Sequence, residues 1–171
     1  MNSLRAIHDA TVAGDLARLR AAFGNDAAFP NVRDECGDTC LSYAILFGPL
    51  ELVRTLLTLG ADPNYDDPGG VPALLSAVDR EVPDRYEVLE LLLAAGADIT
   101  RRGLNDYTAL HYAACHDDVA AVELLLRHGA DPAAATRIDD YATAAELAER
   151  LGHHVGAAAV RRWQETHPWP S

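Results

Sequence analysis

Three cysteines and one neighbouring histidine are the residues whose types and spacing first suggest chemistry, in the form of a metal site. Cys36 and Cys40 are separated by three residues, and His116 directly follows Cys115. Structural zinc takes four thiolate or imidazole ligands. Cys40 and Cys115, however, belong to predicted helices that lie two units apart in a helical repeat array, which is described below. Because each helix layer is about 10 Å thick, the two thiols would be too far apart to bind one ion. We therefore expect small, half-buried side chains here, with no metal and no cofactor.

The histidines and glycines give little support for catalysis. His153 and His154 are a second candidate pair of ligands, but we expect His154 to face solvent. His111 stands at the start of a predicted helix, where an imidazole serves as a structural hydrogen-bonding group. Gly69 and Gly70 form a turn and do not follow a strand, as the glycines of a phosphate-binding loop would. The sequence therefore predicts no catalytic residue and a protein that is not an enzyme.

The charge balance restricts the class of partner. The chain has 171 residues and a net charge of −12, and each of its 14 basic residues is an arginine. Nucleic-acid binding needs clustered positive charge, so we expect no nucleic-acid partner. The acidic balance favours a partner protein with a basic surface. Simple solubility is the other explanation, and Asp62, Asp98 and Asp131 carry part of the charge as members of a repeated motif.

Cysteine usage and hydropathy predict the compartment. Three cysteines are an odd and sparse count that does not suggest a disulfide framework. The first ten residues lack the charged and then apolar pattern of a signal peptide. No window approaches the ~20 apolar residues that a membrane span needs. We expect a small, stand-alone, monomeric protein of bacterial type, located in the cytoplasm and without a membrane partner.

One apolar stretch that ends in Gly-Ala-Asp recurs three times and organises the chain. Its copies are residues 56–62, 91–98 and 124–131, and Gly60, Gly96 and Gly129 are separated by 36 and 33 residues. Each copy is typical of the last turn of a helix that a glycine ends in a left-handed conformation. A helix end that recurs every ~33 residues indicates a stacked repeat array.

Apolar spacing and turn residues then predict a helical hairpin in each unit. The expected helices cover about residues 4–13, 16–23, 40–47, 50–59, 72–80, 86–95, 109–116, 119–128, 144–151 and 155–164. Three additional residues, Glu81–Pro83, account for the longer spacing of 36. The expected core leucines are Leu56, Leu57, Leu92, Leu93, Leu125 and Leu126. Truncating one of them to alanine should cost about 2–5 kcal/mol.

These units resemble ankyrin repeats, whose motif is Thr-Pro-Leu-His-x-Ala, a glycine break, a leucine-rich helix and Gly-Ala-Asp. The chain has Thr108-Ala-Leu-His-Tyr-Ala113 and Thr39-Cys-Leu-Ser-Tyr-Ala44, and a weaker copy in Pro72-Ala-Leu-Leu-Ser-Ala77. Residues 6–10 and 144–148 fit as degenerate first and last repeats. The resemblance covers about residues 3–163 and implies an all-α solenoid with short β-hairpin-like turns.

The resemblance also implies the domain organisation. A single domain, residues 1–171, would hold five stacked repeats at about 3–30, 31–64, 65–100, 101–132 and 133–164, with a tail at 165–171. In the family the motif histidine ties adjacent turns together by hydrogen bonds. It is present as His8 and His111 and is replaced by Ser42, Leu75 and Glu146. Those ties should therefore be weaker in the middle of the array.

Finally, the resemblance implies a binding surface. In ankyrin arrays the turn tips and the far ends of the first helices line a concave face that binds another protein. The corresponding residues are Glu35, Asp38, Leu46, Phe47, Asp66, Val71, Asp79, Arg80, Arg102, Leu104, Tyr107, His116, Asp139, Asp140 and Arg150. Large apolar groups ringed by charge are typical of interface hot spots. The alternative for Leu46 and Phe47 is that they tuck under the next turn.

The function that this surface implies is non-catalytic protein binding. The narrower role could be that of an inhibitor or immunity protein that masks a basic partner. An assembly scaffold or adaptor with several partners is one alternative, and an enzyme is the other. Tyr43 and Tyr112 occupy equivalent places in their repeats, which favours packing over function.

Overall fold

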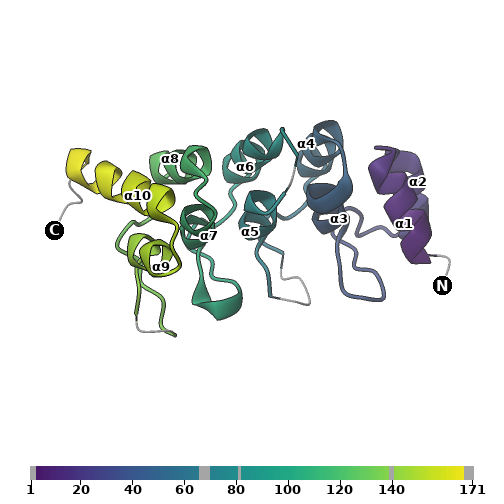
Figure 1. Ribbon diagram of the computed structural model, residues 1–171. Coiled ribbons are helices and arrows are strands. Elements are labelled where there is room, and N and C mark those ends of the chain that lie inside the picture. Colours follow the sequence, from purple (N-terminus) through teal and green to yellow (C-terminus); the bar gives the residue numbers. More distant parts are fainter. Residues whose placement is uncertain (1–2, 66–69, 81, 139–140, 168–171) are drawn as a thin grey trace. The chain divides into compact units, whose positions relative to one another are not determined.

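The computed structural model of the protein describes residues 3–65, 70–80, 82–138 and 141–167 (Figure 1). Three residues expected to contact a partner, Asp66, Asp139 and Asp140, lie outside these described residues, as does Glu81 of the three-residue insertion. The chain divides into two compact units, Met1–Asp98 and Ile99–Ser171. The described residues contain ten α-helices and a single 3-10 turn.

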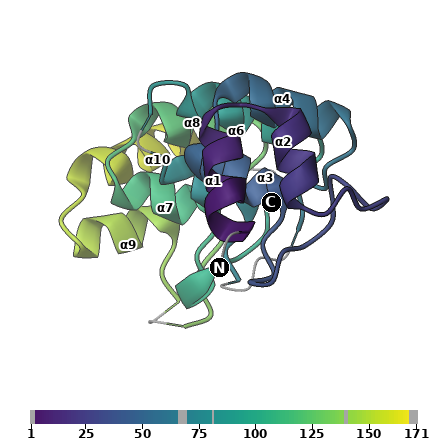
Figure 2. The ribbon, with the colours of Figure 1, turned by 90° about the vertical axis from the view of Figure 1, so that its right-hand side faces the viewer.

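The first unit is a series of helical hairpins. Its helices are α1 (Ser3–Val12), α2 (Leu16–Ala22), α3 (Cys40–Phe47), α4 (Leu50–Thr58), α5 (Ala73–Val78) and α6 (Arg85–Ala94). Each odd-numbered helix packs against the even-numbered helix that follows it, and α1 and α2 form the hairpin at the N-terminal end (Figure 2). Helix α3 contacts both α1 and α5, and α4 contacts α6. The first helices of the hairpins therefore form one layer of this unit.

The second unit repeats the plan with two hairpins. It contains the 3-10 turn η1 (Leu104–Asp106) and helices α7 (Ala109–Cys115), α8 (Val119–Arg127), α9 (Ala144–Arg150) and α10 (His154–Thr166). Helix α9 packs against α7, and α10 contacts α7, α8 and α9. The observed helix bounds differ from the expected ones by no more than two residues, and the all-α repeat fold is confirmed.

Helix α10 comes unusually close to the end of α7. A Cβ atom at Gly156 would lie 2.0 Å from the carbonyl oxygen of Ala114, so only glycine fits there. The N–H of Gly156 donates to Oδ1 of Asp117 at 2.7 Å, and Oδ2 of Asp117 lies 3.3 Å from Nδ1 of His153. His153 is therefore part of a structural contact, whereas His154 is exposed at the start of α10.

Glycine conformation explains the recurrent Gly-Ala-Asp motif. Gly60, Gly96 and Gly129 have φ angles of +90°, +89° and +89°, a region in which a side chain would be strained. The turns that lead into α3 and α9 each close with a single antiparallel bridge, Arg33 with Thr39 and Ala135 with Thr143. The turns are thus hairpin-like, as expected.

Two asparagine side chains link consecutive motifs of the first unit. Nδ2 of Asn31 donates to the carbonyl of Gly60 at 2.9 Å, and its Oδ1 accepts from the N–H of Asp62 at 2.8 Å. Asn64 makes the same pair of bonds to Gly96 and Asp98, at 2.9 and 2.7 Å. One carboxamide therefore satisfies two backbone groups beyond each glycine cap.

The leucine-rich second helix of each hairpin supplies much of the core, but two of the six leucines expected there are not fully buried. Leu56, Leu92 and Leu125 are fully buried, and Leu126 is 4% exposed. Leu57 and Leu93 were expected in the core and are only half-buried. In α4 and α6 the flanking leucine faces partly outward, whereas in α8, which also contacts α10, the three successive leucines 124–126 are all buried.

We predict that Leu92→Ala destabilises the protein by about 2–5 kcal/mol, because it leaves a cavity in a fully buried site. Leu93→Ala, one residue further along the same helix, should cost distinctly less. Urea unfolding followed by circular dichroism measures both variants against the wild type. Equal losses for the two variants would contradict this description of the core.

Candidate functional site

Two large apolar side chains stand exposed at the C-terminal end of α3. Leu46 is 48% exposed and Phe47 is 49% exposed. The ring of Phe47 lies 5.3 Å from that of His8 on α1, centroid to centroid. The alternative that these side chains tuck under the next turn is therefore wrong. Such a pair exposes apolar surface for which the fold of this unit has no need.

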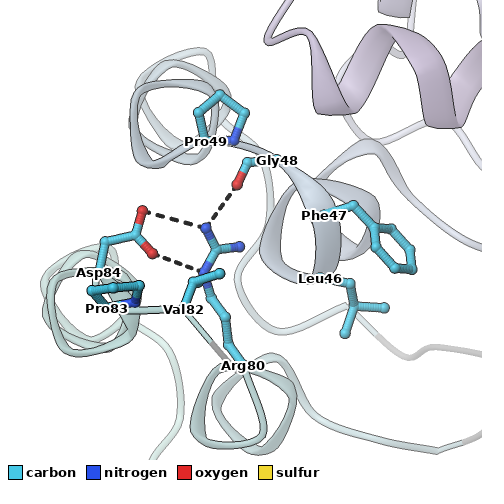
Figure 3. Close-up of a pocket in the computed structure, with 8 residues that line it drawn as sticks. All are labelled: Leu46, Phe47, Gly48, Pro49, Arg80, Val82, Pro83 and Asp84. Carbon is cyan, nitrogen blue, oxygen red and sulfur yellow. Dashed lines mark hydrogen bonds and ion pairs between the residues drawn. The ribbon is translucent and has the colours of Figure 1, made fainter.

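A hollow of about 460 Å³ lies beside this pair, between the end of α3 and the residues that precede α6 (Figure 3). Its lining residues are Leu46, Phe47, Gly48, Pro49, Arg80, Val82, Pro83 and Asp84. In Figure 3, Pro49, Val82 and Pro83 surround the Arg80 guanidinium, whereas Leu46 and Phe47 point away from it. The described part of the insertion, Val82 and Pro83, thus forms one wall. No pattern in the sequence indicated that these two residues and Pro49 would adjoin the predicted pair.

Arg80 is the clearest correction among the predicted binding residues, because it is buried, with 5% of its surface exposed. Its guanidinium donates to the carbonyls of Ala44, Ile45 and Gly48 and pairs with Asp84, whose Oδ1 lies 3.0 Å from Nε. The last carbonyls of a helix lack partners within the helix and carry partial negative charge, so a cation is favoured there. Arg80 therefore caps α3 and fixes the start of α6, and its side chain is not available to a partner.

The other predicted residues of the first unit are exposed to different degrees. Glu35 and Asp79 are exposed, whereas Asp38 and Val71 are half-buried. Tyr43 donates its hydroxyl to Oδ2 of Asp34 at 2.8 Å. Partial burial, together with that carboxylate, raises the pKa of Tyr43 above its ordinary value. Tyr43 therefore has the packing role that its position suggested.

A smaller hollow in the second unit brings together two predicted residues, Tyr107 and His116. It measures about 190 Å³ and is also lined by Tyr112 and Cys115, which the sequence did not assign to binding. The rings of Tyr107 and Tyr112 meet edge to face with centroids 6.0 Å apart, and Tyr112 and His116 are also 6.0 Å apart. His116 follows the helix-capping threonine of its repeat at the same distance along the sequence as Phe47 does. The two hollows therefore use corresponding helix ends.

Arg102, another predicted contact residue, mainly holds the turns of the second unit together. Its Nη1 donates to Oδ2 of Asp106 at 2.9 Å and to the carbonyl of Ala135 at 2.9 Å. Arg137 reaches the same carboxylate, with its Nη2 2.6 Å from Oδ1 of Asp106. The Arg137 guanidinium, with Arg102 beside it, holds the pKa of Asp106 well below its usual range. Leu104 is 55% exposed in the same turn, and Arg150 is also exposed.

The cysteines do not form a metal site within the described residues, where no cluster of three or more possible ligands occurs. Cys36 is exposed, whereas burial raises the pKa of Cys40 to about 12 and that of Cys115 to about 11. Such thiols stay protonated at neutral pH and are weak nucleophiles and weak ligands. In the part of the chain that the structure describes, no helix has the length and apolar character needed to cross a membrane.

His111 supports the structure from inside the second unit, where it is fully buried. Its Nδ1 accepts from the N–H of Thr108 at 3.3 Å, and its Nε2–H donates to the carbonyl of Ala142 at 3.2 Å. The bond to Ala142 links α7 to the turn before α9, which is the tie that the resemblance implied for this histidine. Burial lowers the pKa of His111, so the imidazole is neutral in the folded protein.

Acidic charge is concentrated in the first unit. Residues 1–98 contain 7 arginines and 16 aspartates and glutamates, a net charge of −9. Residues 99–171 contain 7 arginines and 10 acidic residues, a net charge of −3. The unit that carries the Leu46 and Phe47 pair therefore has most of the negative charge.

Comparison with known proteins identifies the family. A model of three ankyrin repeats matches residues 7–103, and a single ankyrin repeat matches residues 105–137. The chain is 31% identical to inversin from Canis lupus familiaris over 121 residues, which cover 71% of this chain and 11% of inversin. It is 39% identical to the transient receptor potential channel pyrexia of Drosophila melanogaster over 106 residues, or 61% of this chain and 11% of the channel. The chain belongs to the ankyrin-repeat family.

The family membership fits the site geometry. The chain spans only about a ninth of the length of these relatives, so the likeness concerns the repeats. Ankyrin repeats are protein–protein interaction modules and are generally non-catalytic. The exposed helix ends described above are the features of this chain that such a module would use.

We predict that His111 makes stability depend on pH. A histidine in the unfolded chain titrates near pH 6.5, and the pKa of His111 is lower in the folded protein. The contribution of neutral His111 to the free energy of unfolding is therefore complete above about pH 6.5 and is lost as the pH falls below that value. The urea midpoint of the wild type should drop between about pH 7 and pH 5. His111→Gln, which does not titrate, should show a shallower drop, and identical slopes would contradict the assignment.

Proposed function

We propose that the chain binds another protein through the concave side of its repeats, with the exposed ends of the first helices as the main contacts. The observation that carries this proposal is the half-exposed pair Leu46 and Phe47, which the first unit does not bury. Tyr107 and His116 line the corresponding hollow of the second unit. Large apolar groups at the centre of a polar surface supply most of the energy in typical interfaces.

The partner that we propose presents a basic surface. The net charge of −9 on the first unit supports this choice, since complementary charge accelerates encounter and disfavours like-charged partners. The exposed side chains of Glu35 and Asp79 belong to that unit. The corresponding biological role is that of an inhibitor or immunity protein that masks a basic partner.

An assembly scaffold is the second candidate role. The observation that favours it is the presence of one apolar hollow in each unit, which offers two separate places for contact. A scaffold would hold two partners at once, whereas an inhibitor would hold one. The mass of the complex recovered from cell extract, measured by light scattering, separates the two roles.

We further propose that the chain acts as a non-catalytic monomer in the cytoplasm. Three free cysteines, of which Cys36 is exposed, support a reducing compartment. Sedimentation of the purified chain tests the monomer, and fractionation of the source cell tests the compartment.

We predict that the double variant Phe47→Ala with Tyr107→Ala abolishes capture of the partner, because it removes one aromatic anchor from each unit. Affinity purification from extracts of the source cell, followed by mass spectrometry, measures the capture. Leu59→Ala is the matched control, since Leu59 is 50% exposed but lies at the end of α4, a second helix. Unchanged capture by the double variant, at unchanged helical content, would show that another face binds.

We also predict that added salt slows association with the partner. Screening shortens the reach of the −12 charge, to about 8 Å at physiological ionic strength. Stopped-flow or surface-binding measurements across a salt series give the association rate. A rate that does not depend on salt would remove the basic partner from the proposal.

A further inference from the structure

The hollow at the C-terminal end of α7 is walled by aromatic rings. Tyr107, Tyr112 and His116 line it together with Cys115, around a volume of about 190 Å³. The rings of Tyr107 and Tyr112 are inclined at 70° with their centroids 6.0 Å apart, so they form a corner. The ring of His116 lies at 26° to that of Tyr112, also with centroids 6.0 Å apart. Three π-systems therefore adjoin one small space.

Contacts within the second unit fix the positions of these rings. Tyr107 stacks on the buried imidazole of His111, with ring centroids 5.8 Å apart and an angle of 8°. His111 is itself held by the N–H of Thr108 and the carbonyl of Ala142. Nδ1 of His116 lies 2.7 Å from the carbonyl of Tyr112, one turn earlier in the chain. The walls are thus formed by the fold, which lowers the entropic cost of binding a ligand between them.

The repeat fold does not require this aromatic lining. Counted from the capping threonine, the residues of the α3 repeat that correspond to Tyr107, Tyr112, Cys115 and His116 are Asp38, Tyr43, Leu46 and Phe47. A carboxylate therefore stands in place of the first tyrosine. The ring of Tyr43 meets that of Phe23 of the first hairpin, with centroids 6.3 Å apart. The corner of two tyrosines is a feature of the second unit.

The electrostatics of the hollow favour a cation. The face of an aromatic ring is the negative end of its quadrupole and attracts positive charge. The last carbonyls of α7 (Ala109–Cys115) add partial negative charge at the same end. At the corresponding end of α3, the guanidinium of Arg80 bonds the carbonyls of Ile45 and Gly48. The chain therefore already places a guanidinium at one such helix end.

We propose that this hollow binds the guanidinium group of an arginine side chain of the partner protein. The planar group stacks on one tyrosine ring, and its edge meets the other. The source of the arginine rests on the proposed function, with its basic partner, whereas the affinity of the hollow for a guanidinium does not.

The shape of the lining favours arginine over lysine. A guanidinium is flat and weakly hydrated, so it can lie against a ring without losing much bound water. A lysine ammonium is a compact and strongly hydrated charge, which the apolar walls would have to strip of water. A neutral apolar side chain would fit the walls but would gain nothing from the ring quadrupoles.

The first test compares a charged and a neutral probe of the same shape on the full chain. N-acetyl-arginine amide should bind at least about fivefold more tightly than N-acetyl-citrulline amide, whose side chain ends in an uncharged ureido group. The N–H signals of Cys115 and His116 report binding in an NMR titration at constant ionic strength. The titration is made at about pH 8, where an ordinary imidazole is neutral. N-acetyl-lysine amide should bind less tightly than the arginine probe.

The second test changes one wall. Tyr107→Leu keeps an apolar side chain but removes the ring, so the preference for arginine over citrulline should fall to about one. Tyr107→Phe is the matched control and should keep the preference, because a phenylalanine ring also attracts cations. Circular dichroism checks that both variants fold.

Two results with the wild-type chain would overturn the site, whether or not Tyr107→Leu folds. One is equal affinity for the arginine and citrulline probes, which would show that the charge is not recognised. The other is tighter binding of N-acetyl-leucine amide at the same signals, which would assign the hollow to an apolar side chain. Neither titration uses a partner. Failure to capture a partner therefore counts against the proposed function alone, and failure of the titration counts against the site alone.

Discussion

A two-helix hairpin of about thirty residues cannot bury its apolar face alone, and this constraint determines the rest of the structure. The fully buried Leu56 and Leu92 show the solution in the first unit, where α4 packs against α6. The glycines of the Gly-Ala-Asp motif make the stacking possible, because their positive φ angles reverse the chain directly after each second helix. Within each unit, neighbouring hairpins are thereby presented to one another in the same orientation.

Charged and polar side chains connect the hairpins where the core cannot. Arg80, two residues after the end of α5, caps α3, and Asp106 joins two turns of the second unit through Arg102 and Arg137. Asn64 bonds the Gly96 cap of the next motif. Residues that look available for a partner are thus used inside each unit. The surface left for a partner is mainly apolar, and acidic groups such as Glu35 and Asp79 accompany it.

Sequence periodicity was sufficient for the fold because it reports backbone geometry directly. The glycine spacing and the capping threonines located the helices to about two residues. The exposure of individual side chains was less predictable, because it depends on tertiary neighbours that are distant in sequence. Arg80 was placed on the surface because nothing local shows that the carbonyls of α3 lie within its reach. The i,i+4 partner Asp84 was the available signal. Asn31 and Asn64 were missed because each acts on residues about thirty positions away.

The candidate site could be predicted from the sequence only in part, for the same reason. The repeat register correctly indicated that Leu46, Phe47 and Leu104 are exposed. It did not indicate Val82 and Pro83, because an insertion has no counterpart in the other repeats from which its position could be inferred. Tyr112 was assigned to packing and also lines the hollow with Tyr107, so one side chain serves both purposes.

The central claim is that the ends of the first helices form the surface that binds a partner. Hydrogen exchange of the chain, alone and saturated with the captured partner, tests this claim most directly. The account predicts added protection around residues 45–48 and 114–117, and little change over the outer second helices α4, α6 and α8. Protection concentrated on those second helices, with none at the ends of α3 and α7, would contradict it.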